Sequence, residues 1–293
     1  MAAISVAVRR LAVVVSGVSL LSLLLVTPAF ADSPLVDGET APASPVPALV
    51  APSSAPDGGP STLAEAQAHA RSRPVVRQGV DVSIWQGYID WQRVARTSVD
   101  FVVAKATEGT GYVDPWYALN AVRARKAGIY FTAYHFARPQ GGGRDARAAA
   151  DFFLKHARLR PGDLVPALDL ERSGTLSDAQ LVHWTLIWLQ HVHHKLGVMP
   201  MVYSNPGFWM SHMANSTAIA KAGFEILWIG HWGTRRPLVP ARKWAGKGWT
   251  FWQYTDCGHV AGINGCVDRD TFHGPKLHYL TIGQQRQQLR SAT

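Results

Sequence analysis

The chain has only two cysteines among its 293 residues, and both lie in one short segment. A scaffold held by several disulfide bonds, as in small secreted domains, is therefore excluded. Arg-rich tracts, basic helices and nucleic-acid-binding motifs are also missing, so we expect no nucleic-acid partner. Internal repeats that would form a separate binding array are absent as well. The chain must therefore fold by burying apolar side chains in an ordinary core.

The N-terminus has the pattern of an export signal. A basic pair, Arg9 and Arg10, precedes an apolar stretch at residues 11–26, and a small-residue cleavage site ends at Ala31. We expect a signal peptide over residues 1–31 and a secreted, extracellular or wall-associated protein. Two alternatives stay open, because the apolar stretch is close to the lower limit for an uncleaved membrane anchor and the arginine pair also permits twin-arginine export.

Composition divides the rest of the chain into three parts. Residues 32–75 are rich in Pro, Ala and Ser, which predicts a disordered linker. Residues 76–280 contain all eleven tryptophans and both cysteines, and their length suits one domain with an ample core. Residues 281–293 form a short C-terminal tail. We expect a monomer.

Acidic residues are in the minority, with 20 Asp and Glu against 29 Lys and Arg, and the formal net charge is +9. This excess of basic over acidic residues favours an anionic partner. For an exported protein the candidates are cell-wall polymers and lipid head groups. We expect the charge to hold the protein near anionic cell-wall polymers.

The two cysteines, Cys257 and Cys266, share one loop in a protein that leaves the reducing cytoplasm. We therefore expect a disulfide that closes this loop and contributes about 2–3 kcal/mol of stability. The alternative is a metal site that adds His259 and His273 to the two cysteines, but structural zinc sites usually have closer Cys-x-x-Cys spacing. We expect no metal and no cofactor.

Short β-rich runs alternate with helical patterns through the domain. The runs are residues 79–83, 101–105, 129–136, 165–170, 201–203, 226–229, 249–254 and 267–269. Helical patterns follow the first five runs, and loops follow the last three. This order predicts an α/β fold, an irregular TIM-like barrel of the (β/α)5(β)3 type with parallel strands and right-handed crossovers.

Polar side chains gather at the carboxyl ends of these runs, where βα barrels place their catalytic groups. They are Asp81, Thr107, Glu108, Tyr134, His135, Asp169, Glu171, Tyr203, His231, Gln253 and Asp268. Asp169 and Glu171 share one face of a strand, about 6 to 7 Å apart, so they cannot ionise independently. A proton donor beside an anion is what cleavage of a glycosidic bond requires.

Several blocks of sequence are similar, in order, to one known family. They are Gly79-Val80-Asp81-Val82-Ser83, Gln86-Gly87, Ile89-Asp90-Trp91, Lys105-Ala106-Thr107-Glu108-Gly109, Tyr134-His135-Phe136, Leu168-Asp169-Leu170-Glu171, Trp252-Gln253-Tyr254 and Val267-Asp268. This ordered set resembles glycoside hydrolase family 25, the muramidases often called Chalaropsis-type lysozymes, over essentially the whole domain. The resemblance implies hydrolysis of the β-1,4 bond between N-acetylmuramic acid and N-acetylglucosamine in the glycan strands of peptidoglycan.

The matching positions imply roles for individual carboxyl groups. Glu171 corresponds to the general acid and Asp169 to its neighbour on the same strand, with Asp81 and Asp268 as flanking carboxylates. The resemblance favours the substrate's own 2-acetamido oxygen as the nucleophile, polarised by Asp169, with net retention at the anomeric carbon. A direct Asp nucleophile or an activated water stays open as an alternative.

Other matching positions would line the sugar site. They are Tyr134, Tyr203, Gln253 and His231, the last a departure because many relatives have an aromatic side chain there. Trp252 is our preferred stacking residue for a sugar ring, and Trp85, Trp209 and Trp232 are further candidates. Trp184 and Trp188, four residues apart on a predicted helix, are interpreted as core. A histidine cluster, His191, His193 and His194, lacks metal-ligand spacing and is interpreted as a solvated helix end.

Two other classes of function compete with a muramidase. A non-catalytic glycan-binding protein would keep an aromatic groove but would not need Asp169 and Glu171. Another exported barrel hydrolase, such as a chitinase, would use the same carboxylate chemistry.

Overall fold

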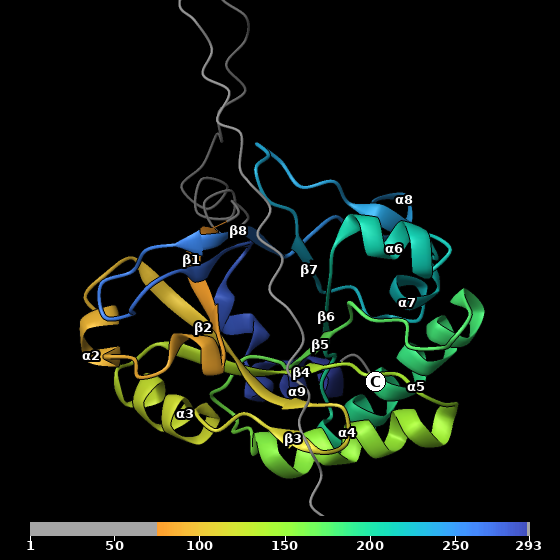
Figure 1. The fold of residues 1–293 in the computed structure, drawn as a ribbon, viewed down its shortest axis with the longest axis horizontal. Helices are drawn as coiled ribbons and strands as arrows, with labels where there is room; N and C mark the ends of the chain where they lie inside the picture. Colours follow the sequence, from red (N-terminus) through yellow and green to blue (C-terminus); the bar gives the residue numbers. More distant parts are fainter. Residues whose placement is uncertain (1–74, 292–293) are drawn as a thin grey trace, which may run out of the picture. The chain divides into compact units, whose positions relative to one another are not determined.

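Eight strands close into a barrel in the computed structural model, which describes residues 75–291 (Figure 1). They are β1 (Val75–Val82), β2 (Val99–Glu108), β4 (Tyr130–Phe136), β5 (Ala167–Asp169), β6 (Met201–Ser204), β7 (Leu227–Gly230), β8 (Phe251–Gly258) and β9 (Val267–Gly274). Hydrogen bonding follows the order β1-β9-β8-β7-β6-β5-β4-β2, and the β1–β2 pairing closes the ring. A short strand, β3 (Tyr112–Val113), pairs with the end of β2. The eight-stranded irregular barrel expected from the sequence is confirmed. The predicted signal peptide and most of the predicted linker lie outside the described residues.

Strand direction differs from the prediction at β9. This strand is antiparallel to both of its neighbours, β8 and β1, whereas the other barrel pairs are parallel. Asp268 therefore stands near the start of its strand and not at the carboxyl end. It still reaches the same rim as the other carboxylates, because the β1–β9 register places it opposite Asp81.

Helices cover the outside of the barrel. They are η1 (Ile84–Gln86), α2 (Trp91–Val94), α3 (Tyr117–Lys126), α4 (Gly143–Ala157), α5 (Asp178–Leu196), α6 (Pro206–His212), α7 (Ala218–Lys221), the left-handed turn α8 (Pro240–Ala245), η2 (Leu277–Leu280) and α9 (Ile282–Ser291). The longest, α5, begins at a capping box in which the Ser177 amide donates to Gln180 Oε1 at 2.9 Å, and it ends at Gly197. Trp184 and Trp188 are buried on its inner face, as predicted.

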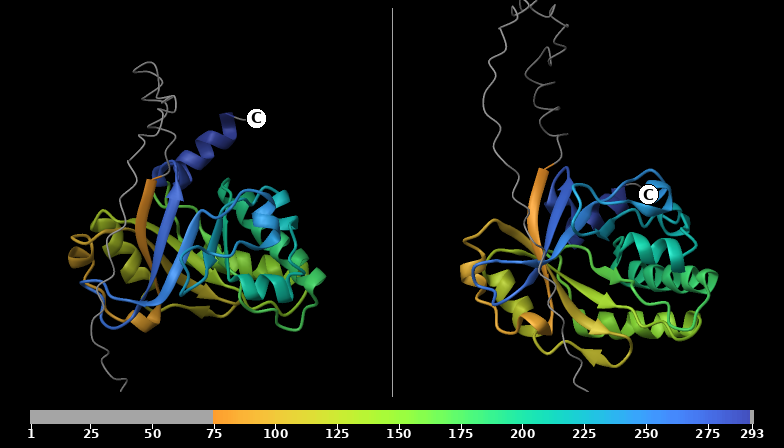
Figure 2. Two further views of the ribbon diagram at one scale, coloured as in Figure 1. Left: turned by 90° about the horizontal axis from the view of Figure 1, so that it is seen from above. Right: turned by 45° about the horizontal axis from the view of Figure 1, so that its top comes forward.

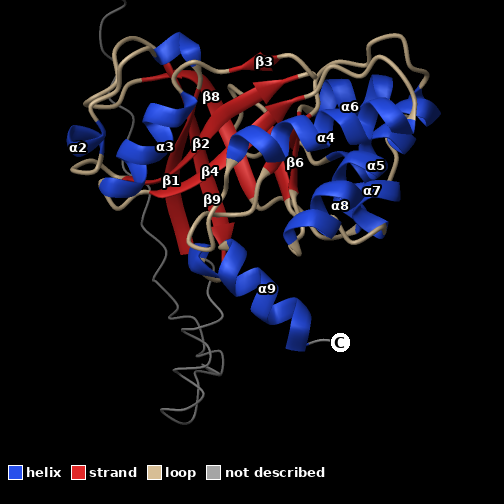
Figure 3. Cartoon of the chain, turned by 90° about the horizontal axis from the view of Figure 1, so that it is seen from below, coloured by secondary structure: helices blue, strands red, loops and turns tan. Residues whose placement is uncertain are grey.

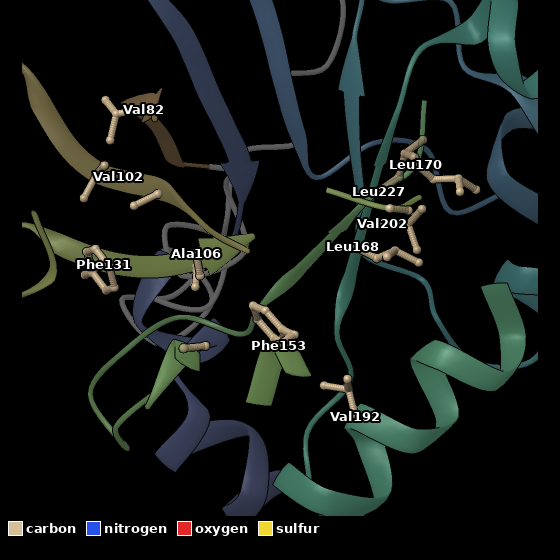
Figure 4. Close-up of a cluster of buried hydrophobic side chains, with 14 of the residues drawn as sticks. Val82, Val102, Ala106, Phe131, Phe153, Leu168, Leu170, Val192, Val202 and Leu227 are labelled. Atoms are coloured by element: carbon tan, nitrogen blue, oxygen red, sulfur yellow. The ribbon is translucent and has the colours of Figure 1, made fainter. Parts of the chain in front are cut away.

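Alternating strand residues supply two separate cores. One face of each strand packs against the helices, where Phe131, Leu168 and Val202 form part of a cluster with Phe153 of α4 (Figure 4). The other face fills the barrel interior with side chains such as Phe101 and Phe251. Because the interior is filled below the rim, the polar groups at the rim sit on an apolar floor.

The last described residues close the other end of the barrel. The amide of Ile282 donates to the carbonyl of Asp163 at 2.8 Å, and its side chain is buried with Leu277 in the interior cluster. The Arg286 Nε then donates to the Leu196 carbonyl at 2.7 Å. Residues described above as a C-terminal tail thus include a helix, α9, at the end of the molecule away from β3 (Figures 2 and 3).

A disulfide joins Cys257 and Cys266 across the connection between β8 and β9, with 4.4 Å between the two Cα atoms. The predicted pairing is confirmed, and it removes both thiolates from the alternative metal site. The side-chain Nε2 of Gln86 donates to the Cys266 carbonyl at 3.3 Å, which ties this loop to η1.

Reduction and alkylation of this disulfide are expected to lower the melting temperature by about 5–10 °C, the effect of losing about 2–3 kcal/mol from a domain of this size. Catalysis in the cold should persist, because neither sulfur lies in the cleft described below. Differential scanning calorimetry and rate measurements before and after alkylation check both outcomes. Free thiols in the non-reduced protein would contradict the premise.

Candidate active site

The rim of the barrel holds a cleft of about 240 Å³ at the carboxyl ends of the parallel strands. It is lined by Asp81, Ser83, Trp85, Lys105, Tyr134, Phe136, Asp169, Glu171, Tyr203, Trp228, Trp232, Gln253 and Asp268. All four predicted catalytic carboxylates are in this set, together with both predicted tyrosines and the predicted glutamine. They come from six different strands or strand ends, so only closure of the barrel brings them together.

One pair of carboxyl groups follows β5. Asp169, its last residue, is almost fully buried, and Glu171 lies two residues further on at the mouth, where it is partly exposed. Burial raises the pKa of Asp169 well above its usual value, and the nearby charge of Glu171 adds to this rise. Burial also raises the pKa of Glu171, against the lowering effects of a Tyr203 hydrogen bond and of Arg172. The two carboxyl groups therefore titrate as a coupled pair, in which a proton held by one favours ionisation of the other.

A second carboxyl cluster joins β1 to β9. Asp81 and Asp268 face each other across the two strands, and Asp270 lies two residues beyond Asp268. Burial, reinforced by the charges of its two neighbours, raises the pKa of Asp81 well above its usual value. Burial likewise raises the pKa of Asp268 to about 6 and that of Asp270 to about 8. The cluster is therefore also partly protonated near neutral pH.

Gln253 connects the two carboxyl clusters. Its Oε1 accepts from the Tyr203 hydroxyl at 2.8 Å and from Trp232 Nε1 at 3.0 Å, and its Nε2 donates to Asp81 Oδ2 at 2.7 Å. These bonds fix the orientation of the amide. The neighbouring strand ends in Gly230, because a Cβ there would lie 2.4 Å from the Tyr203 hydroxyl oxygen.

Two charged residues at the site were not among the sequence candidates. Asp270 is fully buried and accepts a 2.8 Å hydrogen bond from Trp228 Nε1. The sequence feature that could have identified it is its position two residues after Asp268, the same spacing as between Asp169 and Glu171. Lys105 lines the cleft and lowers the pKa of Asp169, and it lies at a partly buried position of β2 within one of the sequence blocks that resemble the family.

Comparison with known proteins is consistent with this geometry. The family model described as Glycosyl hydrolases family 25 matches residues 80–263. The chain belongs to this family. It is 34% identical over 219 residues to lysozyme M1 of Streptomyces globisporus, and the match covers 70% of each chain. It is 33% identical over 216 residues to the N,O-diacetylmuramidase of Chalaropsis sp., and that match covers 65% of this chain and 95% of the relative.

Solved structures show the same fold. A bacterial lysozyme from Streptomyces coelicolor superposes with a TM-score of 0.64 at 32% identity, covering 71% of this chain and 98% of that one. A family GH25 lysozyme from Aspergillus fumigatus superposes with a TM-score of 0.63 at 29% identity. The match covers 71% of this chain and 99% of that one. The protein is therefore a glycoside hydrolase of family 25.

Two pockets flank the cleft of this family 25 hydrolase, and both share Glu171 with it. The larger, about 490 Å³, has mainly apolar walls that include Met210 and Leu238, and His231 is part of its lining. The amide of Leu238 donates to His231 Nδ1 at 2.9 Å, which fixes the imidazole. The other pocket, about 380 Å³, is basic. Glu171 thus lines the cleft and both flanking pockets.

The structure places two of the candidate tryptophans outside the lining of the cleft. Trp252 does not line the cleft: it lies on the opposite side of β8 from Gln253, packs against Trp249 and donates from Nε1 to the His231 carbonyl at 2.8 Å. Trp209 is fully buried against Trp244. Trp85 and Trp232, which are 88% and 47% exposed, do line the cleft and remain available for stacking.

The histidines of α5 are used structurally. His191 Nε2 lies 2.6 Å from Asp151 Oδ1 of α4, and His193 Nδ1 lies 2.9 Å from the carbonyl of Val198. Within residues 75–291 no group of three or more His, Cys, Asp or Glu side chains is arranged to hold a metal ion. No helix in that same range is long and apolar enough to cross a bilayer.

The buried cluster predicts how stability depends on pH. Because folding raises the pKa of Asp270 to about 8, its stabilising contribution is complete below the unfolded pKa near 4 and is lost as the pH rises through about 8. Asp270→Asn keeps the acceptor for Trp228 and cannot ionise. We expect its melting temperature relative to wild type to be higher at pH 8.5 than at pH 5, by at least about 3 °C.

Thermal melts of both proteins across this range check the prediction. Glu225→Gln, which removes an exposed carboxylate paired with Lys247, serves as the matched control. Parallel curves for wild type and Asp270→Asn would show that Asp270 is ionised throughout.

Proposed function

We propose that this protein is an N-acetylmuramidase that hydrolyses the β-1,4 bond between N-acetylmuramic acid and N-acetylglucosamine in peptidoglycan. The observation that supports this most strongly is the Asp169 and Glu171 pair at the mouth of the cleft in a family 25 domain. Relatives named lysozyme and N,O-diacetylmuramidase support the same substrate class.

Glu171 acts as the general acid. Its position in the lining of the cleft and of both flanking pockets lets a glycan strand pass over it, and burial keeps its pKa raised so that a proton is available. As the glycosidic bond stretches, this proton goes to the departing oxygen, which would otherwise leave as an unstable alkoxide. Asp169 lies too deep to reach the same oxygen and takes a different role.

Asp169 polarises the substrate's 2-acetamido group. Its Oδ1 is buried and makes no hydrogen bond within the described residues, so an acceptor is free beneath the sugar site. An acetamido N–H that donates to it makes the acetamido carbonyl oxygen more nucleophilic. That oxygen attacks the anomeric carbon as the leaving oxygen departs with the Glu171 proton. Water then opens the cyclic intermediate and returns a proton to Glu171, with net retention.

The remaining cleft residues position the sugar. The Trp232, Tyr203 and Gln253 hydrogen bonds present a fixed polar wall, and Asp81 at its end is held within the β1–β9 carboxyl cluster. Asp268 lies opposite it on the same rim. Tyr134 packs edge-on against Trp228, 6.3 Å between ring centroids, which fixes its ring at the floor of the cleft.

Product analysis tests the proposed function directly. Purified peptidoglycan digested with the protein should yield fragments with reducing-end N-acetylmuramic acid, identified by borohydride reduction and mass spectrometry. Reducing-end glucosamine would instead identify a glucosaminidase, released stem peptides an amidase, and cleavage of chitin alone a chitinase.

Substitutions test the assigned roles. Glu171→Gln keeps the shape but cannot deliver a proton, so kcat should fall at least about 100-fold while glycan binding persists. Asp169→Asn should be nearly as damaging, because the anion that polarises the acetamido group is lost. Glu225→Gln, an exposed glutamate paired with Lys247, is the matched control. Near-normal turnover by Glu171→Gln would remove the proposed acid.

Wild-type enzyme on de-N-acetylated glycan tests the acetamido step by itself. We expect such glycan to bind without being cleaved, because the internal nucleophile is missing. Cleavage at an ordinary rate would favour a direct Asp nucleophile or an activated water.

The setting proposed for this activity is outside the cell, with the protein acting as a secreted monomer held near anionic wall polymers by its excess of basic over acidic residues. Attraction between exposed charges is screened over about 8 Å at physiological ionic strength, so adsorption to isolated walls should weaken as salt rises. Walls stripped of teichoic acid should bind less protein at low salt. Adsorption that is indifferent to both treatments would mean that cleft contacts alone hold the substrate.

A further inference from the structure

The basic pocket beside Glu171 has no place in the mechanism derived above. Its volume is about 380 Å³, and its walls include Arg138, Gln140, Arg172, Phe208 and His212. They come from the loop after β4, the loop after β5 and helix α6. Glu171 is the one carboxylate in its lining, and it joins this pocket to the cleft.

Positive charge in this pocket is not fully neutralised. Arg172 is exposed and has no hydrogen bond or ion pair to another side chain within residues 75–291. Arg138 pairs with Glu108 Oε1 through Nε at 2.7 Å and through a terminal nitrogen at 2.6 Å. Glu108 also accepts from Lys105 at 2.5 Å, so one carboxylate is shared by two cations. The guanidinium of Arg172 thus lines the pocket near Glu171 without a hydrogen bond or ion pair within residues 75–291.

The walls of the pocket are held in place before any ligand arrives. Gly174 packs so closely on the other loop that a Cβ there would lie 1.8 Å from the Pro139 carbonyl oxygen. Asp145 Oδ2 accepts from the amides of Gln140 and Gly141 and from Trp184 Nε1, at 3.0, 3.2 and 2.8 Å. A site fixed in this way loses little entropy when it binds an anion.

We propose that this pocket binds a carboxylate carried by the O3 substituent of the muramic acid residue, with Arg172 as its main ligand. The inference rests on the proposed muramidase function. The glycan backbone itself is neutral, so carboxylates on this substituent distinguish muramic acid strands from chitin. A planar guanidinium matches a carboxylate with two parallel hydrogen bonds. The flanking pocket on the other side of Glu171, with Met210 and Leu238, offers no such cation.

Occupancy of the pocket also acts on the general acid. The charge of Arg172 lowers the pKa of Glu171 in the free enzyme. A bound carboxylate offsets that charge, so Glu171 keeps its proton to higher pH when a carboxylate-bearing strand is in place. The correct substrate thus favours the protonated form that its cleavage requires.

The test compares soluble glycan strands with the same strands after carbodiimide-mediated amidation by ammonia, which makes their carboxylates neutral. We expect wild type to prefer the native strands in kcat/KM by about tenfold, as for a charge-assisted contact at a partly exposed site. Arg172→Gln should reduce this preference to about twofold or less, and Arg172→Lys should retain part of it. Arg96→Gln, which removes the same charge outside the pocket, should keep the wild-type preference.

The pH profile gives a second readout that a merely structural effect would not move. Because Arg172 lowers the pKa of Glu171, Arg172→Gln should shift the basic limb of the kcat profile, which reports the enzyme–substrate complex, to higher pH on amidated strands. On native strands the shift should be smaller, because bound carboxylate already offsets Arg172 in the wild type. An unmoved basic limb together with an unchanged substrate preference would overturn the proposal.

Two sources of carboxylate are separated by removing the stem peptides with an amidase, which leaves the lactyl carboxylate free. If wild type prefers native over amidated strands only when the stem peptides are intact, the pocket binds a stem-peptide carboxylate. If that preference appears only after amidase treatment, the pocket binds the lactyl carboxylate. If wild type prefers neither form over its amidated counterpart, the pocket does not bind carboxylate. Reducing-end muramic acid among the products in that case would leave the proposed function standing, whereas its absence would refute the function itself.

Discussion

Burial of several carboxyl groups at one end of the barrel is the constraint on which the rest of the site depends. Asp81, Asp169 and Asp270 are each at most 7% exposed, and Glu171 and Asp268 stand beside them. Burial disfavours the charged form of each group and raises its pKa, for Asp270 to about 8. Burial of these carboxyl groups destabilises the fold at high pH, where they must ionise. The same burial raises the pKa of Glu171, the acid that glycoside hydrolysis requires.

The antiparallel strand β9 is what makes this concentration of charge possible. A parallel strand would present its last residues to the rim, whereas β9 presents its first ones, Asp268 and Asp270, opposite β1. Gln253 on β8 then links Asp81 to Tyr203 and Trp232 through three hydrogen bonds. Side-chain and indole N–H groups thus satisfy one oxygen of Asp81 and one of Asp270, whereas Asp169 Oδ1 stays without a partner within residues 75–291.

Glu171 is set apart from the other carboxyl groups by its position. It belongs to the cleft and to both flanking pockets, one with mainly apolar walls and one basic. A residue in this position lies next to the scissile bond and also interacts electrostatically with charged substituents of the substrate. Chemistry and substrate choice are therefore coupled through a single side chain in our proposal.

The sequence alone determined the eight strand segments, the disulfide and the carboxylate pair, because each follows from local periodicity or from spacing within a few residues. It did not determine which face of a strand points inward. Gln253 and Trp252 were both predicted to bind substrate, although neighbours on a strand face opposite sides, and only the packing of β8 showed that Gln253 faces the cleft. Trp209 was equally ambiguous until α6 packed it against Trp244. Lys105 and Asp270 could be assigned to the site only through barrel closure and the β1–β9 register, because these depend on contacts between residues far apart in the chain.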